Sequence, residues 1–375
     1  MLFVLGLGVV FFLSWSLYQP IIDFFSGNME SSSSSEKESS SRPESSSSRV
    51  VSEPSSAPEV VPPEALRAAY MPIETLYSSD ALDRFLNMLS ENGLNSILLD
   101  VKTQEGYVTY TSELPQLKGS AAVMDGAISN MADTVSLLRA RGISVIANIH
   151  VFRDAVGSRG DYEKAIHYLD SNLFWLDDSK ENGGKTWLNP CSPKARDYVV
   201  SIAVEAAQMG FDAILFSDVR FPGRLGAAYA DYGAEVNEGN KSGYLAAFVD
   251  EALKALDGYG TAVYFSSSAV DSISGDIFSY GAKPVDIAKS GYAPTLYPSE
   301  YDASRSAYDA VTAQLKKLDG YIDPEKDGSL AFLPVLQAFG GYGRDEIAQQ
   351  IAALSDRGFY SYILYSGDGA YPDAG

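Results

Sequence analysis

Residues 193–219 read PKARDYVVSIAVEAAQMGFDAILFSDV, and this stretch decides the fold. Apolar residues recur at helical spacing from Pro193 to Met209, Gly210 follows, and a short apolar run begins at Ala213. Glycine readily adopts the left-handed conformation that often ends a helix. The stretch therefore predicts a helix that ends before Gly210 and is followed by a buried strand over 213–219.

The same helix and strand pattern repeats along the chain from about Glu64 onward. We expect eight strands, over 71–76, 96–102, 144–152, 213–219, 261–267, 291–297, 331–338 and 360–366. Helical patterns lie between them, over 79–92, 131–141, 193–209, 244–256, 303–317 and 345–356. Eight alternating units predict an α/β fold with a parallel sheet, namely a TIM (β/α)8 barrel, with an open doubly wound sheet as the alternative.

The composition excludes several classes of protein. The 375 residues include 49 Asp and Glu against 28 Lys and Arg, and the net charge of −21 argues against nucleic acid as a partner. The single cysteine, Cys191, excludes an intrachain disulfide, and with only His150 and His167 beside it a zinc site is not expected. No G-x-G-x-x-G motif follows the first predicted strand. We therefore predict no cofactor and no metal, although carboxylates alone could hold calcium.

Two segments precede the predicted barrel. Residues 1–25 are apolar up to Asp23, and no small-residue cleavage site follows, which favours an uncleaved transmembrane signal anchor over a removed signal peptide or a buried core helix. Residues 26–63 are rich in Ser, Glu and Pro and predict a disordered linker. Residues 64–375 then form one domain, which we expect outside the cell membrane of a bacterium, more readily a Gram-positive one, since disulfides are lacking. The oligomeric state stays open.

Polar side chains stand at the ends of the second and third predicted strands. In a TIM barrel the working residues lie at the carboxyl ends of the strands. Side chains alternate along a strand, so Asp100 and Lys102 point into the barrel mouth, as do Asn148 and His150. Asp100 and Lys102 could pair with each other or bind substrate, and His150 is a candidate for ligand binding or proton transfer.

Carboxylates and aromatic rings follow the later strands. Asp218 and Arg220 lie after the fourth strand, where they could act in catalysis or form a salt bridge that braces a loop. Glu300 lies after the sixth strand, beside Tyr297. Two carboxylates and aromatic faces are what a glycosidase needs around its substrate. Candidate substrate-binding residues are Asp100, Lys102, Asn148, His150, Arg220, Tyr297, Gln337 at the end of the seventh strand, and Trp187 in the long third connection.

Several segments match a known family in order and spacing. They are 100–102 with 106–108, 151–154, 187–190, 210–212, 220–222, 297–299 and 336–339. Together they resemble the glycoside-hydrolase-like TIM barrels of the family named putative glycosyl hydrolase domain, whose function is unknown. The resemblance covers nearly the whole domain and implies a barrel that hydrolyses a sugar polymer.

The fourth strand departs from the pattern of that family. The family typically has GFDEIQFDYIRFP, whereas residues 210–222 here read GFDAILFSDVRFP. Ala213, Leu215 and Ser217 replace the inward Glu, Gln and Asp, and Asp218 falls on the opposite parity unless the strand end twists. Asn148 stands where the family has Arg, and Glu300 where it has His.

Two functions follow from these features. The first is a membrane-tethered extracellular glycoside hydrolase that acts on a cell-wall or capsular polysaccharide, with Asp218 as the general acid and Glu300 as the nucleophile or base. The alternative is a catalytically degenerate barrel that binds glycan or serves as a scaffold in the cell envelope.

Overall fold

The computed structural model describes residues 65–275, 278–323, 326 and 328–372. The predicted signal anchor over 1–25 and the predicted linker over 26–63 lie outside these residues. No helix within the described ranges is both long enough and apolar enough to cross a bilayer.

Eight parallel strands close into a barrel. In spatial order they are β1 (Arg67–Tyr70), β2 (Ser96–Lys102), β5 (Ser144–His150), β7 (Ala213–Ser217), β9 (Ala262–Ser268), β10 (Gly291–Thr295), β12 (Val335–Gln337) and β13 (Tyr362–Tyr365). Ala69 of β1 lies opposite Ile97 of β2 on one side and Leu364 of β13 on the other. This double pairing closes the sheet, so the predicted TIM barrel is confirmed and the open-sheet alternative is wrong.

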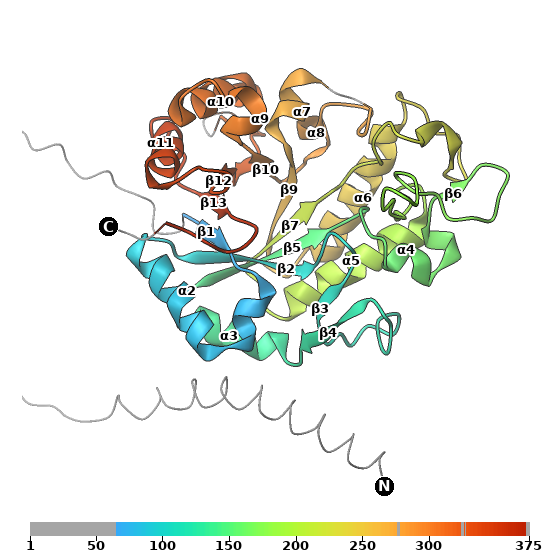
Figure 1. Cartoon of the computed structure of the whole chain (residues 1–375), viewed down its shortest axis with the longest axis horizontal. Helices are drawn as coiled ribbons and strands as arrows, with labels where there is room; N and C mark the ends of the chain where they lie inside the picture. The colour runs from blue at the N-terminus through green and yellow to red at the C-terminus, as the bar shows by residue number, and fades with distance from the viewer. Residues whose placement is uncertain (1–64, 276–277, 324–325, 327, 373–375) are drawn as a thin grey trace, which may run out of the picture.

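Helices cover the outside of the barrel (Figure 1). The long ones are α2 (Ser79–Glu91), α3 (Met131–Ala140), α5 (Pro193–Gln208), α6 (Lys241–Leu256), α10 (Ala307–Ile322) and α11 (Arg344–Ser355). Ser78, Ser192 and Ser306 cap α2, α5 and α10 by accepting a hydrogen bond from a backbone N–H of the first turn. Residues 366–372, the described part of the chain after β13, contain no helix.

Shorter elements fill the connections. They are the α-helices α4 (Gly157–Gly160), α7 (Ala269–Ser274), α8 (Pro284–Ile287) and α9 (Pro298–Asp302), the 3-10 helices η1 (Ile73–Tyr77), η2 (Tyr162–Lys164) and η3 (Ala227–Tyr229), and the strands β3 (Val108–Tyr110), β4 (Val123–Ile128), β6 (His167–Tyr168), β8 (Ala230–Asp231) and β11 (Ala331–Phe332). Strands β3 and β4 extend the sheet beside β2, whereas β6 and β8 form a separate antiparallel pair. None of these elements was predicted apart from β11, which lies within the predicted seventh strand.

The prediction of the first strand over 71–76 is wrong. The strand is Arg67–Tyr70, and Ile73–Tyr77 forms the 3-10 helix η1 instead. Pro72 has no N–H to donate to a sheet and favours a turn, so it ends the strand. The sequence RAAY has little strand character of its own, and it adopts strand geometry because β2 and β13 both pair with it. The predicted seventh strand, over 331–338, is likewise divided by Pro334 into β11 and β12.

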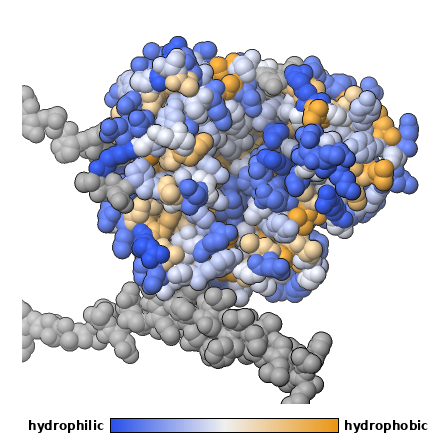
Figure 2. Space-filling view, in the orientation of Figure 1, coloured by the Kyte–Doolittle hydropathy of each residue, from blue (hydrophilic) through white to orange (hydrophobic). Residues whose placement is uncertain are grey.

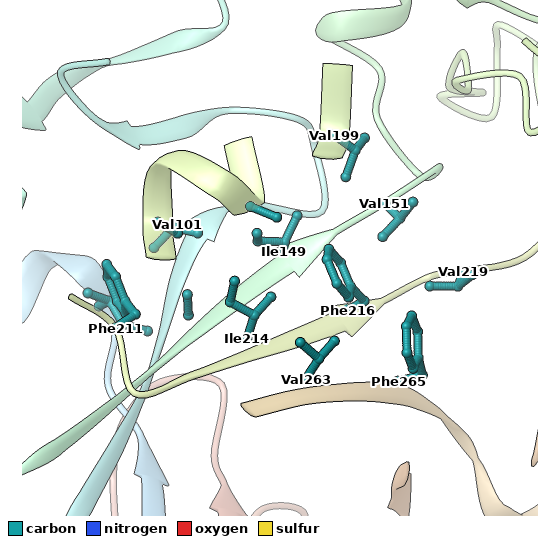
Figure 3. Packing of buried hydrophobic residues seen from close by; sticks show 14 of the residues in the cluster. Val101, Ile149, Val151, Val199, Phe211, Ile214, Phe216, Val219, Val263 and Phe265 are labelled. Carbon is teal, nitrogen blue, oxygen red and sulfur yellow. The ribbon is translucent and has the colours of Figure 1, made fainter. Parts of the chain in front are cut away.

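The alternation of side chains produces two apolar layers. The inner layer fills the barrel with Ala68, Leu98, Ile146, Ala213, Leu215, Ala293, Tyr297, Leu333, Val335 and Ile363. The outer layer lies between strands and helices and includes Val101, Ile149, Val151, Ile214 and Phe216 (Figure 3). The predicted outward faces of β5 and β7 are therefore confirmed. Ala213 and Leu215 fill the interior where the family pattern has polar side chains.

Candidate functional site

The carboxyl ends of three neighbouring strands carry a polar cluster. Strands β2, β5 and β7 are adjacent in the sheet, and their arrowheads in Figure 1 point toward the side of the molecule on which α4 and β6 lie. The register aligns Asp100 with Asn148 and His150 with Ser217. Asp100, Asn148, His150, Ser217 and Asp218, here called the mouth cluster, therefore lie side by side, as the alternation predicted for Asp100, Asn148 and His150.

Asp218 enters the mouth cluster through an unusual backbone conformation. Its φ of 55° lies in the left-handed region, which Asp tolerates better than most residues. This conformation reverses the alternation at the end of β7. Asp218 consequently points inward, while Val219 packs in the outer apolar layer, where Figure 3 shows it near Phe265. The expected opposite parity is thus overcome by a twist at the strand end.

A continuous hydrogen-bond network joins the mouth cluster. His150 Nδ1 lies 2.8 Å from Asp218 Oδ2. Asn148 Nδ2 donates to Asp100 Oδ1 at 2.6 Å and lies 3.2 Å from His150 Nε2. Ser217 Oγ donates to Asn148 Oδ1 at 2.8 Å. If Nδ1 carries the proton toward Asp218, Nε2 accepts from Asn148, and every member of the network has a partner.

Two side chains outside the mouth cluster form hydrogen bonds with its carboxylates, Tyr70 with Asp100 and Arg220 with Asp218. The Tyr70 hydroxyl donates to Asp100 Oδ2 at 3.1 Å. The Arg220 Nε donates to Asp218 Oδ1 at 3.2 Å, so the predicted salt bridge between these two residues is present. The side chains of Asp100, His150 and Asp218 keep 17%, 16% and 11% of their surface exposed, which leaves one face of the cluster open to the mouth.

The pKa values of the two carboxyl groups in the mouth cluster are shifted in opposite directions. Burial raises the pKa of Asp218, but its hydrogen bond to His150 and the charges of His150, Arg220 and Arg153 lower the pKa well below its ordinary value. Burial raises the pKa of Asp100, and the opposing effects of His150, Asn148 and Tyr70 do not cancel it. Asp218 is therefore held ionised, and Asp100 retains its proton to a higher pH than an ordinary Asp. A lowered pKa suits a base or nucleophile at Asp218 better than the general acid expected there.

Lys102 is directed away from the barrel mouth, where it was expected to lie with Asp100. The register shifts between Asp100 and Lys102, and the Lys102 side chain is fully buried. Its Nζ forms an ion pair with Asp154 Oδ2 at 2.9 Å and donates to the carbonyl oxygen of His150 at 2.5 Å. Lys102 therefore fixes the end of β5, from which His150 projects.

Asp154, which was not among the predicted site residues, joins the two loops that border the mouth cluster. Its side chain is fully buried, and its Oδ1 accepts a hydrogen bond from the N–H of Gly157 at 2.5 Å. A Cβ at Gly106 would lie 1.8 Å from the same oxygen. The family resemblance includes both Gly106 and Asp154, and their close packing joins the loop after β2 to the loop after β5.

Trp187 and Gln337 are buried, so neither side chain lies open at the barrel mouth, where contact with substrate was expected. The Trp187 ring is 2% exposed and lies 4.9 Å from the Arg220 guanidinium. The Trp187 ring therefore positions the Arg220 guanidinium by a cation–π contact. Gln337 is 2% exposed, and its Oε1 accepts from the N–H and the hydroxyl of Ser299. Gln337 thus holds the start of α9, which carries Glu300.

Glu300 lies apart from the network of the mouth cluster. It is exposed on α9, and its Oε2 accepts a hydrogen bond from Ser268 at the end of β9 at 3.4 Å. Partial burial and the charge of Asp271 raise its pKa, while the hydrogen bond from Ser268 lowers it less. The predicted pairing of Glu300 with Asp218 is therefore not a direct contact. The structure brings Asp218 together with Asp100 and His150 instead.

Aromatic rings gather beside Asp100. The rings of Tyr70 and Tyr365 lie 5.0 Å apart, and Phe339 contacts both Tyr365 and Tyr297 edge-on. Tyr297 is 8% exposed and belongs mainly to the inner core, whereas Phe339 is 37% exposed. The sequence prediction missed Tyr70 because it placed the first strand at 71–76. With the strand at Arg67–Tyr70, the rule that site residues lie at the carboxyl ends of barrel strands would have identified Tyr70 as it identified Asp100.

Fold and site together define the chain as a glycoside-hydrolase-like TIM barrel with carboxylates at its mouth. The chain belongs to the family described as "Putative glycosyl hydrolase domain", whose model matches residues 68–371.

Known proteins agree with this fold. The glycoside hydrolase domain of PgaB (BpsB) from Bordetella bronchiseptica is 17% identical with a TM-score of 0.59, and the match covers 82% of this chain and 95% of that domain. Alpha-L-fucosidase isoenzyme 2 from Paenibacillus thiaminolyticus is 15% identical with a TM-score of 0.50, over 76% of this chain and 42% of the enzyme. At these identities the likeness shows the fold alone.

A relative by sequence is the S-layer-related protein of Niallia circulans. It is 25% identical over 172 residues, which cover 38% of this chain. The chain spans about a tenth of the length of that relative, since the match covers 10% of it.

Proposed function

We propose that this chain is a glycoside hydrolase that acts on a cell-wall or capsular polysaccharide by carboxylate acid and base catalysis. The observation that carries the proposal is the pair of carboxyls on either side of His150, whose Nε2 lies 4.0 Å from Asp100 Oδ1 and whose Nδ1 lies 2.8 Å from Asp218 Oδ2; the pKa of Asp100 is raised and that of Asp218 is lowered. Glycosidases need such a pair, and oppositely shifted pKa values indicate which group is the acid and which the base or nucleophile.

The pKa shifts of the carboxyl groups assign the acid and base roles. Asp100, whose pKa is raised, donates a proton to the leaving oxygen of the glycosidic bond. Asp218, whose pKa is lowered, is the ionised partner that acts as base or nucleophile, directly or through His150. Glu300, whose pKa is also raised and whose side chain is more accessible, is the second candidate for the acid.

The test is to incubate the full-length chain with purified cell-wall polysaccharides and a panel of glycans, and to detect released oligosaccharides by mass spectrometry. We expect release by the natural chain and a loss of at least about 100-fold in D100N and in D218N. If E300Q rather than D100N abolishes release, the acid is Glu300. Unchanged release by both D100N and D218N would overturn the assignment.

The second candidate function is a barrel that binds glycan without cleaving it, or a scaffold in the cell envelope. Two observations favour it. Ala213 and Leu215 fill the interior with apolar side chains, and both oxygens of Asp218 are already engaged by His150 and Arg220. Saturable binding of one polymer with no new reducing ends would support this function over hydrolysis.

The proposed setting is the outer face of a bacterial cell membrane, with residues 1–25 as anchor and residues 26–63 as tether. The apolar composition of the first segment and the Ser-rich composition of the second support it, as does the likeness to an S-layer-related protein. Deleting residues 1–25 should move the protein from the membrane fraction to the soluble fraction. Retention in the membrane fraction after this deletion would contradict the proposed anchor.

A further inference from the structure

A cavity beside the mouth cluster collects positive charge. It has a volume of about 490 Å³ and is lined by the loops after β2 and β5, by residues 120–122 before β4, and by Lys185 and Thr186. Arg153, Arg159 and Lys185 all line it, and no described residue forms an ion pair with any of the three. In a chain with a net charge of −21, three unpaired cations around one cavity depart from the general charge of the surface.

The carboxylates near the cavity leave this charge largely uncompensated. Glu105 is the one acidic residue among those that line the cavity. Asp154 forms an ion pair with Lys102. Asp177 accepts hydrogen bonds from the Trp187 indole and from the backbone N–H of Lys185. The cavity therefore presents an excess of positive charge to whatever enters it.

The walls of the cavity are fixed by buried hydrogen bonds. The carbonyl of Glu105 accepts from the N–H groups of Ala155 and Val156 at 2.9 and 3.1 Å. Thr186, which has no exposed surface, donates to the carbonyl of Ala155 at 3.1 Å and lies 2.7 Å from the Ser158 hydroxyl. These contacts join the loops after β2 and β5 to the segment at 185–186. The cavity is thus preformed, which lowers the entropy cost of binding.

The cavity also offers an aromatic surface and a connection to the mouth cluster. Tyr107 lines it and is 41% exposed, so its ring is free to stack on a sugar. Arg153 is close enough to Asp218 for its charge to help lower the pKa of that carboxyl. A polymer that occupies the barrel mouth would therefore extend into the cavity.

We infer that this cavity is a subsite for an anionic sugar unit of the glycan, in which Arg153, Arg159 and Lys185 bind a carboxylate or phosphate group and Tyr107 contacts the ring. Arginine matches the geometry of both anions by paired hydrogen bonds. The inference rests on the proposed glycan function and specifies its substrate class as an acidic polysaccharide.

The experiment measures binding of short oligosaccharides to the full-length chain by calorimetry at low and at high salt. The probes are an oligogalacturonate, which carries carboxylates on sugar rings, a phosphorylated manno-oligosaccharide, which carries phosphates on sugar rings, and a neutral cello-oligosaccharide of similar length. We expect at least one anionic probe to bind about tenfold more tightly than the neutral one at low salt, and to lose this advantage at high salt. Which anionic probe binds identifies the source of the charge.

Variants assign the effect to the cavity. The triple variant R153A/R159A/K185A should abolish the preference for the anionic probe, and R159A/K185A, which changes two exposed side chains only, should reduce it. The matched control R84A/K254A/K316A removes the same charge from exposed positions on α2, α6 and α10 and should retain the preference. Circular dichroism verifies that each variant is folded.

Three results would overturn the inference. They are equal binding of anionic and neutral probes, an unchanged preference in both cavity variants, and equally tight binding of poly-L-aspartate, which has charge but no sugar ring. These results are distinct from a failure of the proposed hydrolysis. An anionic preference without product release would leave the subsite standing and reject the hydrolase, whereas cleavage of a neutral glycan only would do the reverse.

Discussion

At the scale of single residues, the backbone conformation of Asp218 determines the site. A non-glycine residue at positive φ is uncommon, and such residues often occur where function requires an unusual side-chain direction. Strict alternation would have placed this carboxylate in the outer apolar layer. The left-handed conformation instead directs it to His150, and Arg220 and the Trp187 ring hold it from the other side.

Replacing Asp218 by Asn tests this description, because Asn tolerates the same backbone conformation but carries no charge. We expect the free energy of unfolding at pH 7 to fall by about 1–3 kcal/mol, since charged hydrogen bonds to His150 and Arg220 are lost. The pKa of Asp218 is lowered by folding, so its stabilisation is present above the unfolded-state pKa of about 3.9 and is lost as the pH falls below it. Urea unfolding at several pH values should therefore show the two proteins converging in acid. A constant difference would contradict the assignment.

The pKa of Asp100 is shifted upward, so its effect on stability depends on pH in the opposite sense. Its pKa is raised by folding, so the stability that it contributes is present below the unfolded-state pKa and is lost as the pH rises through the folded-state value. D100N removes that loss. Its amide oxygen still accepts from Asn148 Nδ2, and its amide N–H donates to the Tyr70 hydroxyl oxygen in place of the bond that this hydroxyl now donates. We expect D100N to be as stable as the natural chain at pH 7 or more stable by up to about 1 kcal/mol, and D100A to be less stable by about 1–3 kcal/mol. Destabilisation by D100N at pH 7 that matches that of D100A would show that Asp100 is ionised.

At the scale of secondary-structure elements, the ends of β2 and β5 are joined by buried charge and by glycine. Asp154 lies between the side chain of Lys102 and the backbone of Gly106 and Gly157. This arrangement fixes the two loops that border both the mouth cluster and the charged cavity. Its stability therefore decides whether either site is formed.

The buried ion pair is tested by a double-mutant cycle. K102M leaves the buried Asp154 without its cation and should cost about 3–5 kcal/mol, as removal of one partner of a buried ion pair usually does. The double variant K102M/D154L should be less destabilised than K102M alone, because no uncompensated charge remains. Thermal or urea unfolding of the two single variants and the double variant measures the coupling. Additive losses in the cycle would show that the pair is not coupled.

The glycine contact is tested by G106A. A Cβ at this position would lie 1.8 Å from Asp154 Oδ1, and the φ of Gly106 is 103°. We expect a loss of about 3 kcal/mol or more, because both the clash and the backbone strain must be relieved. The matched control is G119A, where φ is also positive but nothing lies within 4 Å of the new atom, and which should cost only about 1 kcal/mol. Similar losses of unfolding free energy in both variants would mean that the Asp154 side chain moves away from the new methyl group at little cost.

The sequence predicted the elements better than the details of the site. Period-two alternation depends only on strand geometry, so the inward direction of Asn148 and His150 and the outward faces of β5 and β7 followed directly. The strand Arg67–Tyr70 did not, because its Ala-rich sequence becomes a strand only through its two neighbours. Lys102 lies outside the mouth cluster because the register shifts after Asp100. Asp218 lies within it because a left-handed residue reverses the alternation, which the sequence allowed only as a twist at the strand end.

At the scale of the whole molecule, closure of the barrel brings residues from distant parts of the sequence to one mouth. The Tyr371 hydroxyl donates to the carbonyls of Tyr70 and Leu364, which ties the last described segment to the first strand. Figure 2 shows a largely hydrophilic surface with scattered apolar areas around this scaffold. The mouth cluster and the charged cavity beside it are the chemically distinct features at the carboxyl ends of the barrel strands.

The most direct test of the central claim is the pH dependence of oligosaccharide release by the full-length chain, measured beside D100N on the polymer that is cleaved. The claim is that Asp100 donates a proton while Asp218 stays ionised. It predicts that the rate falls as the pH rises through a value above the ordinary Asp pKa of about 3.9, and that D100N releases at least about 100-fold less than the natural chain at every pH. A rate that does not fall on the alkaline side, or D100N activity equal to that of the natural chain, would contradict it.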